Sequence, residues 1–509
     1  MWTSVLRVVL FAGVGLVALQ FLCKVASLIL DAVDSSVRIL YSPAALLVGL
    51  LVLVAWLPIP LGSNRPWSWT LMHAATMALL GLWCLGYARW SMDVPGAIRE
   101  NGVTLFFFGT WIAYIGVQVL PMSATILEVL SPKALEHYAT AGKAGFSPEF
   151  ALSLDRGSSL AELQKISAYV ALFFLTIALV TTRGRLRFAL VVLTLIGTLE
   201  ALYGILAFLS KDHFRLWSPG FAANSVSGTY VNRNHFAGLM EITVPAGIGL
   251  MLAEPPVSFG RSWRGVLQGI TEFLLKRTAW LSFCVLIMCT ALILSTSRGG
   301  IAALMFGIGF AVAMAAMFRG RSAPEYRIVR WTLGLVIVGV GWLGAGGLVD
   351  KIENVGLTSN RQDLREVTLR VIEDFWLTGS GAGTFRWVFP LYKTEVFGSG
   401  YYEHAHNDFL ELLSEQGIIG FAFAGIAITL LLWRIIAGYA RRRDPLMSGT
   451  LFFAVSGSAA MLAHGWVDFN FNMPANMAMF FVLLGLGAVA VSLNSERNRA
   501  RGFKKRPPT

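Results

Sequence analysis

The sequence predicts an all-α polytopic membrane protein with about 12–13 transmembrane helices, and three observations support this fold class. Of its 509 residues, 56% are hydrophobic and 14% are charged, and the mean hydropathy is +0.64. Apolar runs of about 20 residues, the length that crosses a bilayer, recur along the chain. Short basic loops separate several of these runs. A protein in water with this balance would expose large apolar patches, so the solvent is lipid.

The predicted helices follow the apolar runs in order. The first run, near residues 8–30, is long enough to span and predicts a membrane anchor in preference to a cleaved signal peptide. The other runs lie near residues 40–60, 68–87, 103–120, 165–181, 188–209, 236–253, 279–296, 300–317, 331–349, 417–437, 448–466 and 474–493. A long, partly helical extracytoplasmic loop, residues 350–416, is expected before the last three helices.

The basic residues predict the orientation of these helices. Basic segments occur at residues 181–187, 261–277, 318–330, 441–443 and 494–509. All of them fall on one side if every helix between them spans, and the positive-inside rule makes that side cytoplasmic. The opposite side then holds the loops 121–164, 210–235, 295–300 and 350–416, with the N-terminus. The net charge of +12 is thus a topology signal, and we expect no nucleic acid partner.

We expect four segments in the chain. They are the N-terminal transmembrane helices with extracytoplasmic loop 121–164 (1–199), a central membrane region with loop 350–416 (200–440), a C-terminal helical pair (441–493) and a basic cytoplasmic tail (494–509). The four cysteines all fall inside apolar runs, where a thiol behaves as a small hydrophobe. The sequence therefore predicts no disulfide framework, no metal site and no cofactor.

Titratable residues gather in the segment YYEHAHNDFLELLSEQGIIG, residues 401–420, just before a hydrophobic run. A helix beginning at Asp408 would use Asp408 and Glu411 as a capping box, which gives both carboxylates a mostly structural role. His404 and His406 precede that helix at its positive end, which favours the neutral imidazole that a general base needs. A structural role is an alternative for both. Zinc binding is another, although no third ligand lies at a recognisable spacing.

Arginines on the predicted outer side are the second group of candidates. Arg298 lies in STSRGG, residues 295–300, where a short turn between spanning helices would hold the guanidinium rigidly for a diphosphate; snorkelling is the alternative. Residues 360–377 predict an amphipathic helix lying in the membrane interface. Its apolar stripe consists of Leu364, Val367, Val371 and Phe375. Arg361, at the start of this helix, is expected to bind an anion, whereas Arg365 suits interfacial anchoring.

The segment GTYVNRNHFAGLMEI, residues 228–242, repeats this theme at the head of another helix. It places Arg233 at the helix start and Glu241 less than two turns further on. Capping is the plain role for Asn234. Arg215 lies in the same predicted outer loop and joins the group of candidates.

Two other features stand apart from these arginines. Glu200 lies deep in a predicted spanning helix, which indicates either a functional carboxylate or a neutral, hydrogen-bonded one. The segment TGSGAGTF, residues 378–385, lacks the lysine of a nucleotide-binding loop. We therefore expect a turn that leaves the preceding helix.

The chain resembles the O-antigen ligase superfamily in four segments. They are, in order, Asn-Arg-Asn-His-Phe-Ala-Gly, Ser-Arg-Gly-Gly, Asn-Arg with DFWLTGSGAGTF, and HAHNDFLELLSEQGIIG. The resemblance covers roughly residues 200–440, and the His-x-His-Asn pattern is its most specific part. HGWVDFNFNMPANM, residues 464–477, is similar to the family's last extracytoplasmic turn and contains Asp468. LPIPLGSNRPWSW, residues 57–69, resembles longer members found with exopolysaccharide or capsule synthesis.

The resemblance implies a membrane-embedded, metal-independent glycosyltransferase of the bacterial inner membrane, with its active site facing the periplasm. The superfamily comprises O-antigen ligases, Wzy-type polysaccharide polymerases and protein O-oligosaccharyltransferases. The implied donor is a glycan on undecaprenyl diphosphate. The implied acceptor is a hydroxyl of lipid A–core, of another lipid-linked glycan or of a protein. A chain-length regulator is a further candidate partner, but the sequence contains no sign of it.

The resemblance also assigns roles to the candidates. His406 would be the general base, with His404 the second choice, and Asn407 would orient the base or the acceptor hydroxyl. Arg298 and Arg361 would bind the diphosphate. Supporting candidates are Arg233, Arg215, Asp468, Glu200 and Glu241.

Two other classes of function compete with glycosyl transfer. A flippase or other transporter of lipid-linked glycans would place charges at mid-membrane, where this chain has only His73 and Glu200 well inside a span. A non-enzymatic envelope scaffold would leave the arginines and histidines without a purpose. Ligase and polymerase break the same bond, so the sequence does not separate them.

Overall fold

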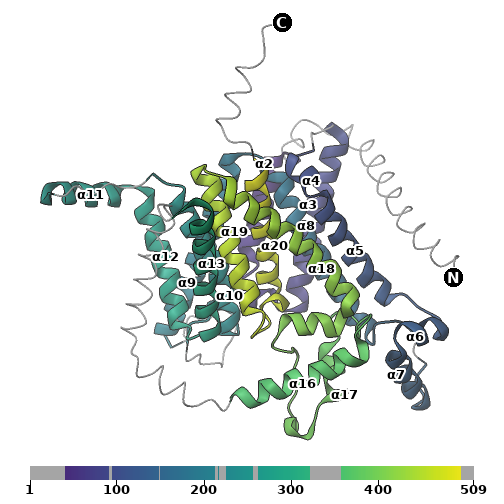
Figure 1. Ribbon diagram of the computed structural model, residues 1–509. Helices are drawn as coiled ribbons and strands as arrows, with labels where there is room; N and C mark the ends of the chain where they lie inside the picture. The colour runs from purple at the N-terminus through teal and green to yellow at the C-terminus, as the bar shows by residue number, and fades with distance from the viewer. Residues whose placement is uncertain are drawn as a thin grey trace.

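The protein is a bundle of long helices with a smaller group of helices beyond one end (Figure 1). The computed structural model describes residues 41–90, 94–147, 149–211, 216, 225–255, 262–320 and 357–493. Across these residues every regular element is a helix, and ten helices are long and apolar enough to cross a membrane. The predicted all-α polytopic fold is therefore confirmed.

The ten helices match ten of the predicted apolar runs. They are α3 (Pro66–Trp90), α5 (Gly102–Val119), α8 (Arg156–Leu179), α9 (Arg183–Leu209), α10 (Arg233–Leu252), α12 (Arg277–Leu294), α13 (Arg298–Arg319), α18 (Asp408–Arg441), α19 (Pro445–His464) and α20 (Pro474–Ser492). The predicted run near 40–60 forms the shorter apolar helix α2 (Pro43–Trp56). The runs near 8–30 and 331–349 lie outside the described residues.

Short helices connect these spans. They are α4 (Gly96–Glu100), α6 (Ala124–Leu130), α7 (Pro132–Lys143), α11 (Trp263–Leu275), α16 (Leu357–Phe375) and α17 (Phe385–Tyr392), with 3₁₀ turns at Leu61–Ser63, Glu395–Phe397 and Asn470–Asn472. Helix α11 projects sideways from the bundle, near the end opposite α16 and α17 (Figure 1).

Helices α10, α19 and α20 form the buried centre of the bundle. Small residues allow the central helices to approach closely, as is usual where lipid provides no hydrophobic driving force. A Cβ built on Gly449 of α19 would lie 2.0 Å from the carbonyl oxygen of Gly249 in α10. A Cβ on Gly307 of α13 would lie 2.2 Å from the oxygen of Ser456 in α19. These contacts fix the relative positions of α10, α13 and α19, which carry much of the candidate site.

One end of the bundle, called the basic end here, collects arginines at helix termini. Arg183 forms an ion pair with Asp444 at 2.7 Å, and Arg187 pairs with Glu254. Arg319 donates to the hydroxyl of Ser448. The described parts of the basic segments near 181–187, 318–330 and 441–443 thus meet at one end, whereas 321–330 and 494–509 lie outside the described residues. The N-termini of α10, α13 and α18 lie at the opposite end, called the site end.

The helices α6, α7, α16 and α17 form a lobe beyond the site end, and this packing corrects one expectation. The predicted apolar stripe of α16 is buried inside the protein: Leu364, Val367, Val371 and Phe375 are at most 2% exposed. However, it packs against protein, including Tyr138 of α7 and Phe389 of α17. The prediction that α16 lies with its apolar face in the membrane interface is therefore wrong. Helix α16 also begins at Leu357, so Arg361 is past its first turn.

The glycine-rich segment 378–385 forms the predicted turn, and it encloses a carboxylate of this chain. Glu415 of α18 accepts hydrogen bonds from Gly383 N and Phe385 N, both at 2.9 Å. Gly379 and Gly381 have positive φ angles of 74° and 115°, which bring the loop against the backbone of α18. The backbone donors of this segment are therefore bonded within the protein, to Glu415 and to Ser414 O and Gln118, and are not left for an external anion.

Replacing Glu415 with alanine should destabilise the protein by about 2–4 kcal/mol, because it leaves buried backbone N–H groups without acceptors. Thermal unfolding in detergent measures this change. The control is Glu373→Gln, an exposed carboxylate on α16. Equal melting temperatures for the Glu415 and Glu373 variants would contradict the proposed anchoring of the loop.

Candidate active site

The candidate site is organised around the turn between α19 and α20, residues 464–469, called the central turn here. Its carbonyl groups bind the segments that the sequence singled out. Asp408 N donates to Gly465 O (2.8 Å), Asn407 Nδ2 to Trp466 O (3.0 Å) and Arg361 Nη1 to Val467 O (3.2 Å). Residues far apart in the chain therefore meet at one short turn.

Asp468 in this turn faces His406. Its Oδ1 lies 3.4 Å from His406 Nδ1, and the Asp468 side chain is 2% exposed while that of His406 is 26% exposed. Asn234 Nδ2 donates to the other oxygen of Asp468 at 2.5 Å. The φ angle of His406 is +51°, a conformation that side chains rarely adopt and that marks a constrained position. The result is a half-exposed imidazole with a buried carboxylate at one nitrogen.

Asp468 remains a carboxylate at neutral pH. Burial by itself would raise its pKa, but the close approach of His406, the nearby His235 imidazole and the hydrogen bond from Phe469 N outweigh burial and hold the pKa below its usual range. A lowered pKa stabilises the fold at neutral pH, and this contribution is lost only as the pH falls through the lowered value. The charge needed to fix an imidazole tautomer is therefore present under ordinary conditions.

His404 has a carboxylate partner of its own. Its Nδ1 lies 2.7 Å from Glu411 Oε1, and Glu411 Oε2 accepts from Ala405 N at 2.7 Å. The expected capping box of Asp408 and Glu411 is therefore wrong. Asn407 is the N-cap of α18, because its Oδ1 accepts from the N–H groups of Phe409 and Leu410 at 3.1 and 3.0 Å.

Phe469 of the central turn contacts three imidazoles. His404 stacks on it with ring centres 4.4 Å apart, while His406 and His235 meet it edge to face at 4.7 and 4.6 Å. One aromatic ring thus orients both candidate bases.

Two of the arginine candidates, Arg233 and Arg298, lie at a second turn, residues 295–300. Arg233 Nη1 donates to Thr296 Oγ1 at 2.8 Å. Ser297 Oγ donates to Asn234 Oδ1 at 2.9 Å, which links this turn to Asp468 through Asn234. Arg298 is the first residue of α13 and is exposed.

The two glycines after Arg298 allow this turn to approach the central turn. A Cβ on Gly299 would lie 3.0 Å from His464 Nε2 and 3.6 Å from Val467, the residue whose carbonyl accepts from Arg361. His464 pairs through Nδ1 with Glu241 Oε1 at 2.6 Å, and both side chains are almost fully buried. Glu241 therefore lies directly beneath the turn that carries Arg298.

Replacing Gly300 with alanine should cost about 1–3 kcal/mol of stability through overpacking. A Cβ there would lie 2.3 Å from Cβ of Ala237, so α13 would have to move away from α10. The matched control is Gly309→Ala on the same helix, where a Cβ meets no atom within 4 Å. Equal unfolding temperatures for the two variants would show that the close helix contact is unimportant.

The structure thus joins most of the predicted residues and leaves some apart. His404, His406, Asn407, Asp468, Arg233, Arg298, Arg361 and Glu241 all touch the two turns or the residues bound to them. Glu200 instead accepts from Thr229 N at 3.0 Å and fastens the loop before α10. Arg215 lies outside the described residues.

Sequence reasoning missed His464, Asn234, Glu411 and Phe469 as parts of the site. His464 and Phe469 belong to HGWVDF, a segment that the family resemblance had already marked as a turn. Asn234 and Glu411 received plausible local capping roles, and only tertiary contacts distinguish these from bonds to Asp468 and His404.

Two well-formed cavities in the described part of the chain, about 450 and 340 Å³, lie at the basic end. No residue of the two turns or of the His404–Asn407 segment lines either cavity. A common hollow shared by the guanidinium and imidazole groups therefore remains a prediction.

The fold and this cluster define a polytopic helical membrane protein with imidazole–carboxylate pairs and exposed arginines at one end. Residues 283–425 match the family described as O-Antigen ligase, a range that includes Arg298, Arg361, His404 and His406. The match supports membership of the O-antigen ligase superfamily, as the motifs predicted. The family implies a membrane enzyme of the glycosyltransferase kind in surface polysaccharide synthesis. No curated protein matches the chain.

Proposed function

We propose that this protein transfers a glycan from undecaprenyl diphosphate to an acceptor hydroxyl at the outer face of the bacterial inner membrane. The transfer is metal-independent and inverts the anomeric carbon. It serves O-antigen, exopolysaccharide or capsule synthesis, with the enzyme acting as ligase or polymerase. The observation that carries the proposal is the meeting of His406, Asp468 and three arginines around two adjoining turns.

The arginines support diphosphate binding because their charges are not used within the described protein. Arg233, Arg298 and Arg361 are exposed, and none forms an ion pair with a described residue. By contrast, Arg183 at the basic end pairs with Asp444 at 2.7 Å. Fixed guanidinium groups stabilise the charge that develops on a departing diphosphate, which is the work a metal ion performs in other transferases.

His406 suits the role of general base. The Asp468 carboxylate lies 3.4 Å from Nδ1 and favours the tautomer with the hydrogen on that nitrogen, which leaves Nε2 to take the proton. Asn407 is a positioning residue. It caps α18 and donates to Trp466 O, and these bonds hold the backbone next to His406. His404 with Glu411 has a similar arrangement and is the alternative base.

The reaction follows from these positions. His406 removes the proton of the acceptor hydroxyl while the oxygen attacks the anomeric carbon from the face opposite the diphosphate. The bond between that carbon and the phosphate oxygen breaks, and its electron pair leaves with undecaprenyl diphosphate. The arginines stabilise the added negative charge, and no covalent enzyme intermediate forms.

The proposed orientation of the protein in the membrane rests on the distribution of its arginines. Arginines concentrated at the basic end favour the cytoplasm for that end, which places the site end in the periplasm, where lipid-linked glycans are used. The lobe packs elements of the two long loops, 121–164 and 350–416, beside the site. It is therefore the part that we expect to select lipid A–core, a second glycan or a protein as acceptor.

A transporter has less support, because its mid-membrane charges should line a pathway. Glu241 is instead bonded to His464 and Glu200 to Thr229, both in buried surroundings.

The test is transfer by the purified protein in proteoliposomes that contain undecaprenyl-diphosphate-linked glycan. We expect release of undecaprenyl diphosphate that depends on an added acceptor and is unaffected by EDTA. Parallel reactions with lipid A–core, a second lipid-linked glycan and an acceptor protein distinguish ligase, polymerase and protein transferase. No release with any acceptor would refute the proposal, and loss of release in EDTA would refute metal independence.

A further inference from the structure

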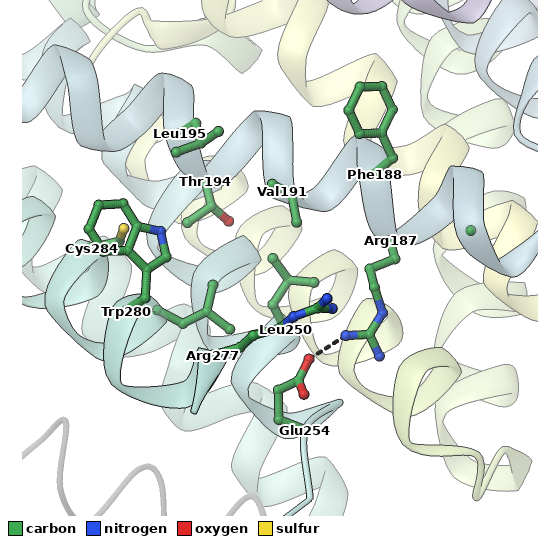
Figure 2. A pocket seen from close by; sticks show the side chains of 12 residues that line it. Arg187, Phe188, Val191, Thr194, Leu195, Leu250, Glu254, Arg277, Trp280 and Cys284 are labelled. Carbon is green, nitrogen blue, oxygen red and sulfur yellow. Dashed lines mark hydrogen bonds and ion pairs between the residues drawn. The ribbon is translucent and has the colours of Figure 1, made fainter. Parts of the chain in front are cut away.

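A well-formed cavity lies at the basic end, away from the candidate site, between α9, α10 and α12. Its volume is about 450 Å³, within the range of about 300–1,000 Å³ that small-molecule sites occupy. Figure 2 shows its lining, with Arg187, Arg277 and Glu254 gathered on one side and Thr194, Leu195 and Cys284 on the other. Nothing in the proposed glycosyl transfer uses this cavity.

The walls of the cavity are apolar and open to the outside of the bundle. Val191 and Leu195 of α9, Leu250 of α10 and Trp280 of α12 line it, and Trp280 is 60% exposed. These helices are long and apolar enough to span, so their outer faces lie against acyl chains. The cavity is therefore a groove that a hydrocarbon chain can enter from the side.

The mouth of the groove carries one excess positive charge. Arg187 and Glu254 form an ion pair, which neutralises both (Figure 2). Arg277 is exposed and has no ion-pair or hydrogen-bond partner among the described residues. A ligand with a single negative charge balances this mouth.

The mouth also lies where lipid head groups are expected. Arg187 is near the start of α9, Glu254 follows the end of α10, and Arg277 is the first residue of α12. Helix α11 ends two residues before Arg277 and exposes Trp263, Leu274 and Leu275. Exposed aromatic and aliphatic side chains beside a basic helix end are typical of the membrane interface.

We propose that this groove binds one monoanionic phospholipid, with its phosphate at Arg277 and one acyl chain along Val191, Leu195 and Trp280. A phospholipid places its phosphate at the basic mouth and its acyl chain against the apolar walls, whereas a free anion would leave the apolar walls without a partner. The site belongs to the leaflet at the basic end. It is independent of the proposed reaction at the site end.

The test is native mass spectrometry of the full-length protein titrated with phosphatidylglycerol or phosphatidylethanolamine of matched chains. Wild-type protein should bind phosphatidylglycerol about fivefold more tightly, the effect of one basic group at a membrane surface. Arg277→Gln should remove this preference, and Glu254→Gln should increase it. Lys276→Gln is the matched control, because Lys276 is paired with Glu272 and does not line the groove.

A second variant tests the acyl chain separately. Val191→Trp should weaken binding of both lipids while the charges at the mouth remain, and excess inorganic phosphate should not displace the lipid. Equal binding of the two lipids by wild type, or an unchanged preference in Arg277→Gln, overturns the proposal. Unaltered lipid binding in Val191→Trp, or displacement of the lipid by inorganic phosphate, also overturns the proposal. Either result would mean that the acyl chain does not occupy the apolar groove.

Discussion

Replacing His406 with alanine should lower the rate of glycan transfer by about 10²- to 10⁴-fold, the usual loss when a general base is removed. The side chain is half-exposed and makes its polar contact with Asp468, so the fold should tolerate the change. The measurement is the initial rate of undecaprenyl diphosphate release in proteoliposomes. Thermal unfolding of the same preparations checks that the variant is folded.

The two imidazole–carboxylate pairs can be told apart by changing each partner. If His406 is the base, Asp468→Asn should impair transfer strongly, while Glu411→Gln acts mainly on stability. The opposite pattern would assign the role to His404. His73→Ala on α3 serves as the control, since His73 makes no hydrogen bond, ion pair or ring contact with a described residue of either turn. Full activity in both His406→Ala and His404→Ala would remove the imidazole from the mechanism.

Arg298→Ala and Arg361→Ala should each raise the free energy of the transition state by about 2–4 kcal/mol, comparable to losing an oxyanion contact. The loss should appear mainly in kcat, because charge on the diphosphate grows as the glycosidic bond breaks. Lysine at either position should restore part of the rate, since it keeps the charge but not the forked geometry of guanidinium.

Arg365→Ala is the matched control for Arg361. Both residues lie on α16 and are exposed, but only Arg361 donates to the central turn, at Val467 O. If the two alanine variants lost the same small amount of activity, Arg361 would be an ordinary surface residue of α16 and would not bind the substrate. If Arg298→Ala changed only KM, its contact would contribute to ground-state binding alone.

Most of the bundle could be predicted from the sequence, because length and apolarity alone define a spanning helix. The shorter α2 shows the limit of this criterion: the apolar run near 40–60 includes Pro58 and Pro60, and the helix ends at Trp56. The stripe of α16 was predicted correctly, but its partner was not. The sequence pattern of an amphipathic helix is the same whether lipid or protein covers its apolar face. Only the packing of α7 and α17 shows that protein covers the apolar face of α16.

The candidate site was partly predictable for a related reason. His406 and Arg298 are conspicuous because polar groups at the outer ends of apolar helices require an explanation. Glu411 was assigned to a cap, since a carboxylate three residues into a helix fits the capping pattern, yet it reaches back to His404 at 2.7 Å. The spacing of residue types in a sequence describes one helix at a time, whereas the hydrogen bonds of the candidate site join separate segments of the chain.

The position of the central turn has a consequence for biosynthesis. The carbonyls that hold Arg361, Asn407 and Asp408, and the Asp468 carboxylate, all follow α19 in the chain. During translation, the earlier helices enter the membrane before these partners exist. A nascent chain that has not yet inserted α19 therefore holds arginines and imidazoles without their common scaffold. On the proposed mechanism the site is complete only once the α19–α20 hairpin has formed, so we expect chains that end before this hairpin to be inactive in glycan transfer.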